Sequence, residues 1–166
     1  LETYKFLSTG LLAGIKSLGL QAKIEDKPVK STNPGSPACF DSASWYEIEV
    51  SGRKLVGSAQ TRRKGVLLQH GSVLLDFDSA MLQQVMFTPN EKVRRRMAAA
   101  LKKRATAINP ELLRIGEKPV SAERVEQALI EGFRQGLGIN LEQSVLTEQE
   151  IITAKKLAET KYSTTG

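Results

Sequence analysis

The segment WYEIEVSGRKLVGSAQTRRKGVLLQHGSVLL, residues 45–75, decides the fold of this chain. Apolar and polar side chains alternate along Trp45–Val50, which is typical of a strand with one buried face. Ser51-Gly52 then supplies a two-residue turn, and the return strand runs over Arg53–Gln60. The sequence therefore predicts an antiparallel β-hairpin at the centre of the fold.

The register of this hairpin predicts the direction of one lysine. A two-residue turn pairs Glu49 with Lys54 and Ile48 with Leu55, and opposite residues of an antiparallel pair share a face. We therefore expect Lys54 to point away from the face that carries Ile48. A cross-strand ion pair with Glu49 is one interpretation of this lysine, and a fixed cation for a carbonyl or phosphate oxygen is the other.

A third strand is predicted over Val66–Leu75, after the polar stretch Thr61–Gly65. Its apolar pattern is interrupted by Gln69-His70-Gly71-Ser72. Small and polar residues inside a buried strand indicate that something approaches the backbone there.

Helices are expected on both sides of this strand-rich block. Residues 2–18 carry apolar side chains at three- and four-residue steps, and a short strand over 21–24 and an extended loop over 27–38 follow. Four helix starts are indicated after the block, at Asp78, Thr88, Ser121 and Thr147. The fold class is therefore α+β, with a mixed, mainly antiparallel sheet flanked by helices. We expect one domain over 1–166, with helix and sheet in 1–87 and a helical portion in 88–166.

The composition excludes several classes of protein. With 166 residues, 40% of them hydrophobic and 25% charged, the chain is typical of a globular domain. Its single Cys cannot form an internal disulfide, and one Cys with one His cannot complete a four-ligand zinc site. No apolar run is long enough to cross a bilayer. We expect a cytoplasmic protein that holds no metal and has no membrane partner.

The net charge of +6 comes mainly from one helix. Seven cations lie within thirteen residues, namely Lys92, Arg94, Arg95, Arg96, Lys102, Lys103 and Arg104. Spread around the helix they would be an ordinary solvated surface, and gathered on one face they would steer an acidic partner. Nucleic acid is not expected as a partner, because no aromatic residue lies among these cations.

Cys39 is the first candidate for chemistry. It lies between a loop rich in Pro, Gly and Ser and the first strand of the hairpin, a place where functional residues concentrate. The thiolate of a nucleophilic cysteine is usually stabilised by a neighbouring cation or a helix N-terminus. Lys54 could be that cation, and His70 is a possible base. The alternative is a small buried side chain with no chemical role. Asp41, two residues further on, could bind loop amides or orient a substrate.

Three ordered motifs in residues 39–76 resemble the biotin/lipoate protein ligase superfamily. They are Cys39-Phe40-Asp41 with Trp45-Tyr46-Glu47, then Gly52–Gln60, then Leu68–Asp76. The segment is most similar to the lipoate-protein-ligase-like octanoyltransferases of Gram-positive bacteria, and the similarity continues more loosely into the first and last helices. The resemblance implies a sheet flanked by helices, related to the core of class II aminoacyl-tRNA synthetases.

The resemblance also implies an activity and a set of site residues. Members of the family attach an octanoyl or lipoyl chain to a lysine of a lipoyl domain or a glycine cleavage H protein. In this chain Lys54 matches the lysine that contacts the acyl carbonyl, and Cys39 matches the cysteine that carries the acyl thioester. Pocket-lining positions are implied at Gly57, Ser58, Ala59 and His70. Asp41 and Gly71 complete our set of expected substrate-binding residues.

Two departures from the family pattern separate the possible functions. ATP-dependent ligases have an Asn-Asp pair where this chain has Phe40-Asp41, which favours octanoyl transfer from acyl carrier protein without a cofactor. The Arg-Arg-x-Thr-Gly-Gly motif of the family is absent, and the chain starts at Leu1 rather than Met, so we expect an N-terminal segment of the same enzyme to be missing. The alternatives are a lipoate-protein ligase that uses ATP and magnesium, and a non-catalytic homologue that binds carrier proteins.

Overall fold

The computed structural model of the protein describes residues 2–25, 47–85 and 87–163. Its centre is an antiparallel sheet with the strand order β1-β2-β3-β4, which confirms the predicted α+β class. The strands are β1 (Ala22–Glu25), β2 (Glu47–Val50), β3 (Arg53–Arg63) and β4 (Val66–Val73). The helices are α1 (Glu2–Ser17), α2 (Ser79–Val85), α3 (Glu91–Arg104), α4 (Ile108–Arg114), α5 (Ala122–Leu137) and α6 (Glu148–Leu157), with a π-helical turn η1 (Ala158–Tyr162) at the end.

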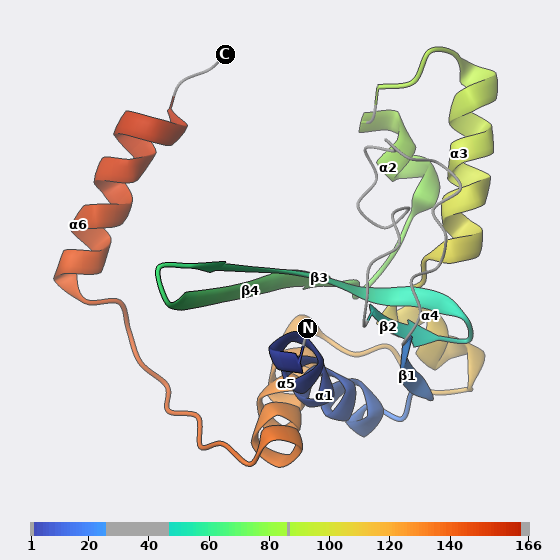
Figure 1. The fold of residues 1–166 in the computed structure, drawn as a ribbon. Helices are drawn as coiled ribbons and strands as arrows, with labels where there is room; N and C mark the ends of the chain where they lie inside the picture. Colours follow the sequence, from blue (N-terminus) through green and yellow to red (C-terminus); the bar gives the residue numbers. More distant parts are fainter. Residues whose placement is uncertain (1, 26–46, 86, 164–166) are drawn as a thin grey trace.

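The helices occupy both sides of the sheet. In Figure 1, α1 and α5 lie side by side below the strands, α2 and α3 stand above them, and α6 stands apart beyond the tip of the β3–β4 hairpin. The core is formed mainly by α1, α4, α5 and the inner faces of β1, β2 and β3. Within the described ranges we find no helix whose length and apolar content would let it span a bilayer.

Both hairpins of the sheet close through two-residue turns. Ser51-Gly52 has φ angles of 54° and 71°, and Lys64-Gly65 has 50° and 79°. Positive φ at both turn positions matches the right-handed twist of the flanking strands. The first turn is as predicted, whereas the second is shorter than expected, because β3 continues to Arg63. The third strand is confirmed as β4, which includes the polar stretch Gln69–Ser72 and ends at Val73, two residues before the expected end.

A β-bulge lies next to Lys54. Glu49 pairs with Lys54 as predicted, but Ile48 pairs with Val56, so Leu55 is an extra residue in β3. The predicted pairing of Ile48 with Leu55 is therefore wrong. Leu55 and Val56 are both buried, at 0% and 3% exposed, and the bulge allows two consecutive apolar side chains to enter the core.

The helix pair below the sheet packs through glycines. A Cβ atom built on Gly132 of α5 would lie 2.2 Å from the backbone nitrogen of Gly14 in α1, and one on Gly14 would lie 2.8 Å from the Ala128 carbonyl oxygen. No larger side chain fits between backbones this close. The absence of side chains at these two positions therefore sets the distance between α1 and α5.

The helix starts follow local capping chemistry. The Ser121 hydroxyl accepts from the Arg124 N–H at the start of α5, and Thr147 with Glu150 forms the predicted capping box of α6. The start predicted at Thr88 is displaced, because the Asn90 side chain caps α3 by accepting from the Val93 N–H at 3.0 Å. Asn is a stronger N-cap than Thr, which accounts for the shift.

Candidate active site

Lys54 is held at both its side chain and its backbone. Its Nζ lies 2.5 Å from Oε1 of Glu47, and both side chains are only 8% exposed. Its carbonyl oxygen accepts a hydrogen bond of 2.9 Å from the Thr106 N–H, and Ala105 pairs with it as an isolated parallel bridge. A buried ammonium group fixed in this way can stabilise negative charge without reorganising.

Acidic side chains surround this lysine on its face of the sheet. Glu49 is the Cα partner of both Lys54 and Lys23, and Lys23 Nζ lies 3.8 Å from Glu49 Oε2 and 3.3 Å from Glu25 Oε2. Burial raises the pKa of Glu49, and the neighbouring Glu25 carboxylate raises it further, while Lys23 lowers it. At the β1–β2 end this face therefore carries buried ionisable side chains at Glu49 and Lys54 beside the exposed Lys23.

Small residues continue the same face along β3. Gly57 pairs with Ser72, and Ala59 pairs with His70. Because side chains alternate along a strand and the bulge reverses the alternation after Lys54, these positions share the face of Lys54. Ala59 and His70 are exposed, and the short side chains at positions 57 and 59 leave room beside the lysine.

A cavity of about 360 Å³ lies on the other face, between the β3–β4 hairpin and the helix pair. Most of its lining is apolar, with Leu7, Leu11, Val56, Val73, Leu129 and Phe133 joined by Ser58, Gln69, His70 and Gly71. Neither Lys54 nor Gly57 nor Ala59 contributes to it. The residues expected to bind substrate are thus divided, with Ser58 and Gly71 at the cavity, Gly57 and Ala59 on the Lys54 face, and His70 at the boundary.

The small residues of β4 have a local structural reason. A Cβ atom on Gly71 would lie 2.4 Å from the Gly57 carbonyl oxygen and 2.8 Å from Oγ of Ser58. The close approach expected from Gln69–Ser72 is therefore made by the neighbouring strand β3. Asp41 and Cys39 lie outside the described residues, in the stretch that leads into β2 at Glu47.

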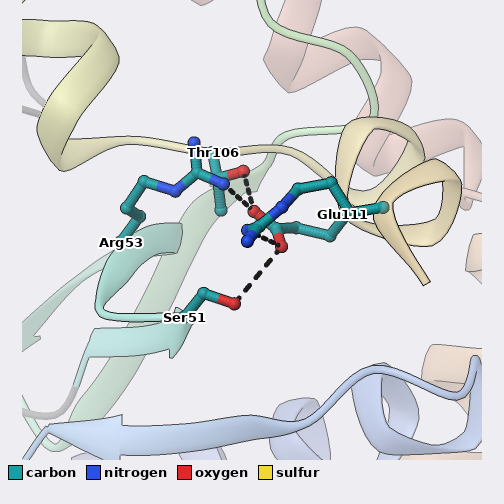
Figure 2. Close-up of polar contacts among 5 residues, drawn as sticks. Ser51, Arg53, Thr106 and Glu111 are labelled. Carbon is teal, nitrogen blue, oxygen red and sulfur yellow. Dashed lines mark hydrogen bonds and ion pairs between the residues drawn. The ribbon is translucent and has the colours of Figure 1, made fainter.

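A buried carboxylate that sequence reasoning missed connects α4 to the hairpin (Figure 2). Glu111 is 2% exposed, and Arg53 and Thr106 both donate to its Oε1, Thr106 at 2.5 Å. Its Oε2 accepts from Arg114 at 3.0 Å and from the Ser51 hydroxyl at 3.5 Å. Arg53 precedes Lys54, and the Thr106 N–H binds the Lys54 carbonyl, so Glu111 stabilises the backbone that carries the lysine. The signal in the sequence was an acidic residue between Ile108 and Leu112 on an apolar helix face.

A comparison with protein families shows which family this chain resembles. Residues 1–134 match the catalytic domain of the lipoyl protein ligases A and B. The chain belongs to this family. The resemblance seen in residues 39–76 is thereby confirmed, and it extends from α1 to the last turn of α5.

Curated relatives in the lipoyl protein ligase A/B family are named octanoyltransferase LipM. The chain is 44% identical to the protein of Brevibacillus brevis and 46% identical to that of Bacillus subtilis. In both comparisons the alignment covers 98% of this chain and 59% of the relative. The chain therefore spans about three fifths of the length of the curated relatives that it matches.

Solved structures of lipoate protein ligases have the same fold. A bipartite lipoate protein ligase of Thermoplasma acidophilum, described with its E2 lipoyl domain, superposes with a TM-score of 0.76 at 26% identity. A lipoate-protein ligase A bound with ATP superposes with a TM-score of 0.72 at 25% identity. These alignments cover 99% and 98% of this chain and 56% of each neighbour. The sheet and its flanking helices are thus a lipoyl protein ligase fold.

Proposed function

We propose that this chain forms part of an octanoyltransferase of lipoate metabolism. The enzyme would move an octanoyl group from acyl carrier protein to a lysine of a lipoyl domain or of a glycine cleavage H protein. The observation that carries the proposal is the buried Lys54, which is fixed at its side chain and its backbone. The sequence also has Cys39 upstream of the same hairpin, and the chain is 42–46% identical to proteins named octanoyltransferase LipM.

Cys39 and Lys54 are the proposed catalytic residues. The Cys39 thiolate attacks the carbonyl carbon of the octanoyl thioester, a C–S bond forms, and the carrier thiolate leaves. The neutral amine of the acceptor lysine then attacks the new thioester, the amide C–N bond forms, and the Cys39 thiolate is released. Lys54 stabilises the oxyanion of both tetrahedral intermediates. His70 is the proposed acceptor of the amine proton.

The remaining site residues are proposed to bind the substrate. Gly57 and Ala59 leave space beside Lys54 for the thioester, and Asp41 orients a substrate group. Ser58 and Gly71 border the apolar cavity of about 360 Å³, a size within the range of small-molecule sites. We propose no cofactor for octanoyl transfer. A further segment of the enzyme, expected on the N-terminal side, is proposed to complete the site. The 59% coverage of the relative leaves room for such a segment.

Two other functions remain as alternatives. An ATP- and magnesium-dependent lipoate-protein ligase is favoured by the similarity to a ligase bound with ATP. In that case Cys39 would be structural, and a Cys39→Ala variant would still lipoylate an acceptor domain with ATP. A non-catalytic homologue would bind carrier protein without turnover.

The decisive experiment weighs the full-length protein after incubation with octanoyl-acyl carrier protein. We expect a gain of one octanoyl group, lost again when an acceptor lipoyl domain is added. Cys39→Ser should abolish the adduct, and Lys54→Ala should slow its formation by roughly a hundredfold or more, as for other donors that stabilise an oxyanion. The matched control is Lys64→Ala, an exposed lysine in the β3–β4 turn. Full transfer by the Cys39→Ser variant would exclude the thioester mechanism.

A further inference from the structure

The exposed face of α3 is almost entirely basic. Along its 14 residues, the exposed positions are Glu91, Lys92, Arg95, Arg96, Ala99, Lys102 and Lys103. Residues three, four and seven apart lie on the same side of a helix, so these positions form one continuous stripe. Five cations and one carboxylate thus share a surface about 21 Å long. The other side of the helix packs through Leu101 and its partly buried neighbours.

Most of this positive charge is not neutralised by neighbouring side chains. Arg95 pairs with Glu91 at 3.1 Å. The other four cations of the stripe, Lys92, Arg96, Lys102 and Lys103, form no ion pair with any other residue in the described ranges. The sequence left open whether the cations of this helix spread around it or gather on one face, and the burial pattern shows that five of the seven gather.

The basic stripe ends beside the proposed catalytic lysine. α3 ends at Arg104, the next residue, Ala105, pairs with Lys54, and the Thr106 N–H donates to the Lys54 carbonyl. Lys102 and Lys103 therefore lie in the last turn of α3, just before Ala105, which bridges to Lys54 in β3. Figure 1 shows α3 rising from this end of the sheet, clear of α1 and α5. A partner bound along α3 would be adjacent to the site.

We propose that the basic face of α3 docks the carrier protein that delivers the acyl group, through an acidic surface of that carrier. The inference rests on the proposed function, which requires a protein-borne thioester to reach Lys54 and Cys39. Clustered cations raise the encounter rate with an oppositely charged partner and orient it. Single-stranded nucleic acid is a poorer occupant, because Lys92–Arg104 offers no aromatic side chain for base stacking.

The test reverses charge at the end of the stripe nearest the site. A Lys102→Glu, Lys103→Glu double variant of the full-length enzyme is compared with Lys155→Glu, Lys156→Glu, which makes the same change at a pair of exposed lysines in the last turn of α6. The rate of octanoyl-enzyme formation is measured with octanoyl-acyl carrier protein and with octanoyl-pantetheine, which carries the same thioester without the protein.

We expect the α3 variant to lose roughly tenfold or more in kcat/KM with the carrier, through KM, and to keep the parent rate with octanoyl-pantetheine. The parent rate with the carrier should fall with added salt, and the α6 variant should behave as the parent. The proposal would be overturned if the α3 variant lost the same rate with both donors, kept the parent kinetics with the carrier, or was slowed only in transfer to the acceptor. Binding of nucleic acid through α3, with the acylation rate unchanged, would also overturn it. Failure of the parent to react with either donor would instead contradict the proposed octanoyltransferase function.

Discussion

Two buried ionic contacts determine where Lys54 lies. Glu47 pairs directly with its ammonium group, whereas Glu111 acts on its backbone through Arg53 and Thr106. Removing one partner from a buried charge pair leaves the other charge desolvated and uncompensated. Both carboxylates are therefore expected to matter for stability, and for the position of the lysine.

A Glu111→Gln substitution should destabilise the protein by about 2 kcal/mol. The amide keeps the shape of the side chain but leaves Arg53 and Arg114 without a counter-charge. Arg53 is partly exposed and Arg114 is exposed, so the cost lies at the lower end for a buried pair. Urea unfolding would measure the change at constant m-value. Glu126→Gln, at an exposed position of α5, is the control and should alter stability by less than about 0.5 kcal/mol. Equal effects of the two variants would contradict the role of Glu111.

The effect of a Glu49→Gln substitution should depend on pH. Burial raises the pKa of Glu49 in the folded protein above the value near 4.5 of an exposed glutamate. The folded state therefore binds this proton more tightly than the unfolded state, so the Glu49 contribution to stability falls as pH rises from about 4 through the folded pKa. We expect the variant to gain stability relative to the parent between pH 4 and pH 7. Unfolding curves across this range check the sign, and a difference that stays constant would count against it.

At the scale of elements, the α1–α5 pair depends on glycine for its close packing. The two helices cover the apolar face of the sheet and form one wall of the cavity, with Leu7 and Leu11 on α1 and Leu129 and Phe133 on α5. Their separation is set by backbone contact at Gly14 and Gly132. A change at this crossing is therefore transmitted to the cavity.

Gly132→Ala should destabilise the protein although alanine is the better helix former. The helix preference of Ala favours the variant by about 1 kcal/mol. The new methyl group, however, would meet backbone atoms of α1 at 2.2–2.6 Å, and these can move only if the helix moves. We expect a net loss of about 2 kcal/mol, as for an overpacked core, measured by thermal or urea unfolding. Gln127→Ala, at an exposed position of the same helix, should be neutral or stabilising. A stabilised Gly132→Ala protein would show that the helices separate at little cost.

At the scale of the whole molecule, the elements differ in how much apolar surface they bury. α1, α4, α5 and the sheet share one apolar core, while α6 has no buried residue and exposes Ile151, Ile152 and Leu157. Figure 1 shows it separated from the other elements. Local stability follows buried contacts, so α6 should open far more readily than the core.

Hydrogen exchange should reveal this difference. We expect the amides of α6 to exchange much faster than those of α1 and α5 in the full-length protein, because α6 buries none of its side chains within the part of the chain that the structure describes. Mass spectrometry of peptides from the two regions makes the comparison within one sample. Protection of α6 as strong as that of α1 and α5 would contradict the prediction.

Local features of the fold followed from the sequence alone. The Ser51-Gly52 turn, the pairing of Glu49 with Lys54, the caps at Ser121 and Thr147, and the family resemblance of residues 39–76 depend on neighbouring residues and their spacing. The expected direction of Lys54 was correct for the same reason. The roles expected for Cys39 and Asp41 stay predictions.

The tertiary structure decided what depends on distant parts of the chain. The bulge at Leu55 exists because the core accepts two adjacent apolar side chains, and it reverses which later residues of β3 share a face with Lys54. The role of Glu111 depends on the packing of α4 against the hairpin, which the sequence does not show. The basic stripe depends on which side of α3 is buried, and this too is set by packing. Strand alternation and helical periodicity are local, whereas burial is a property of the assembled fold. Sequence therefore predicted the elements and the candidate residues, and packing determined which of them lie together.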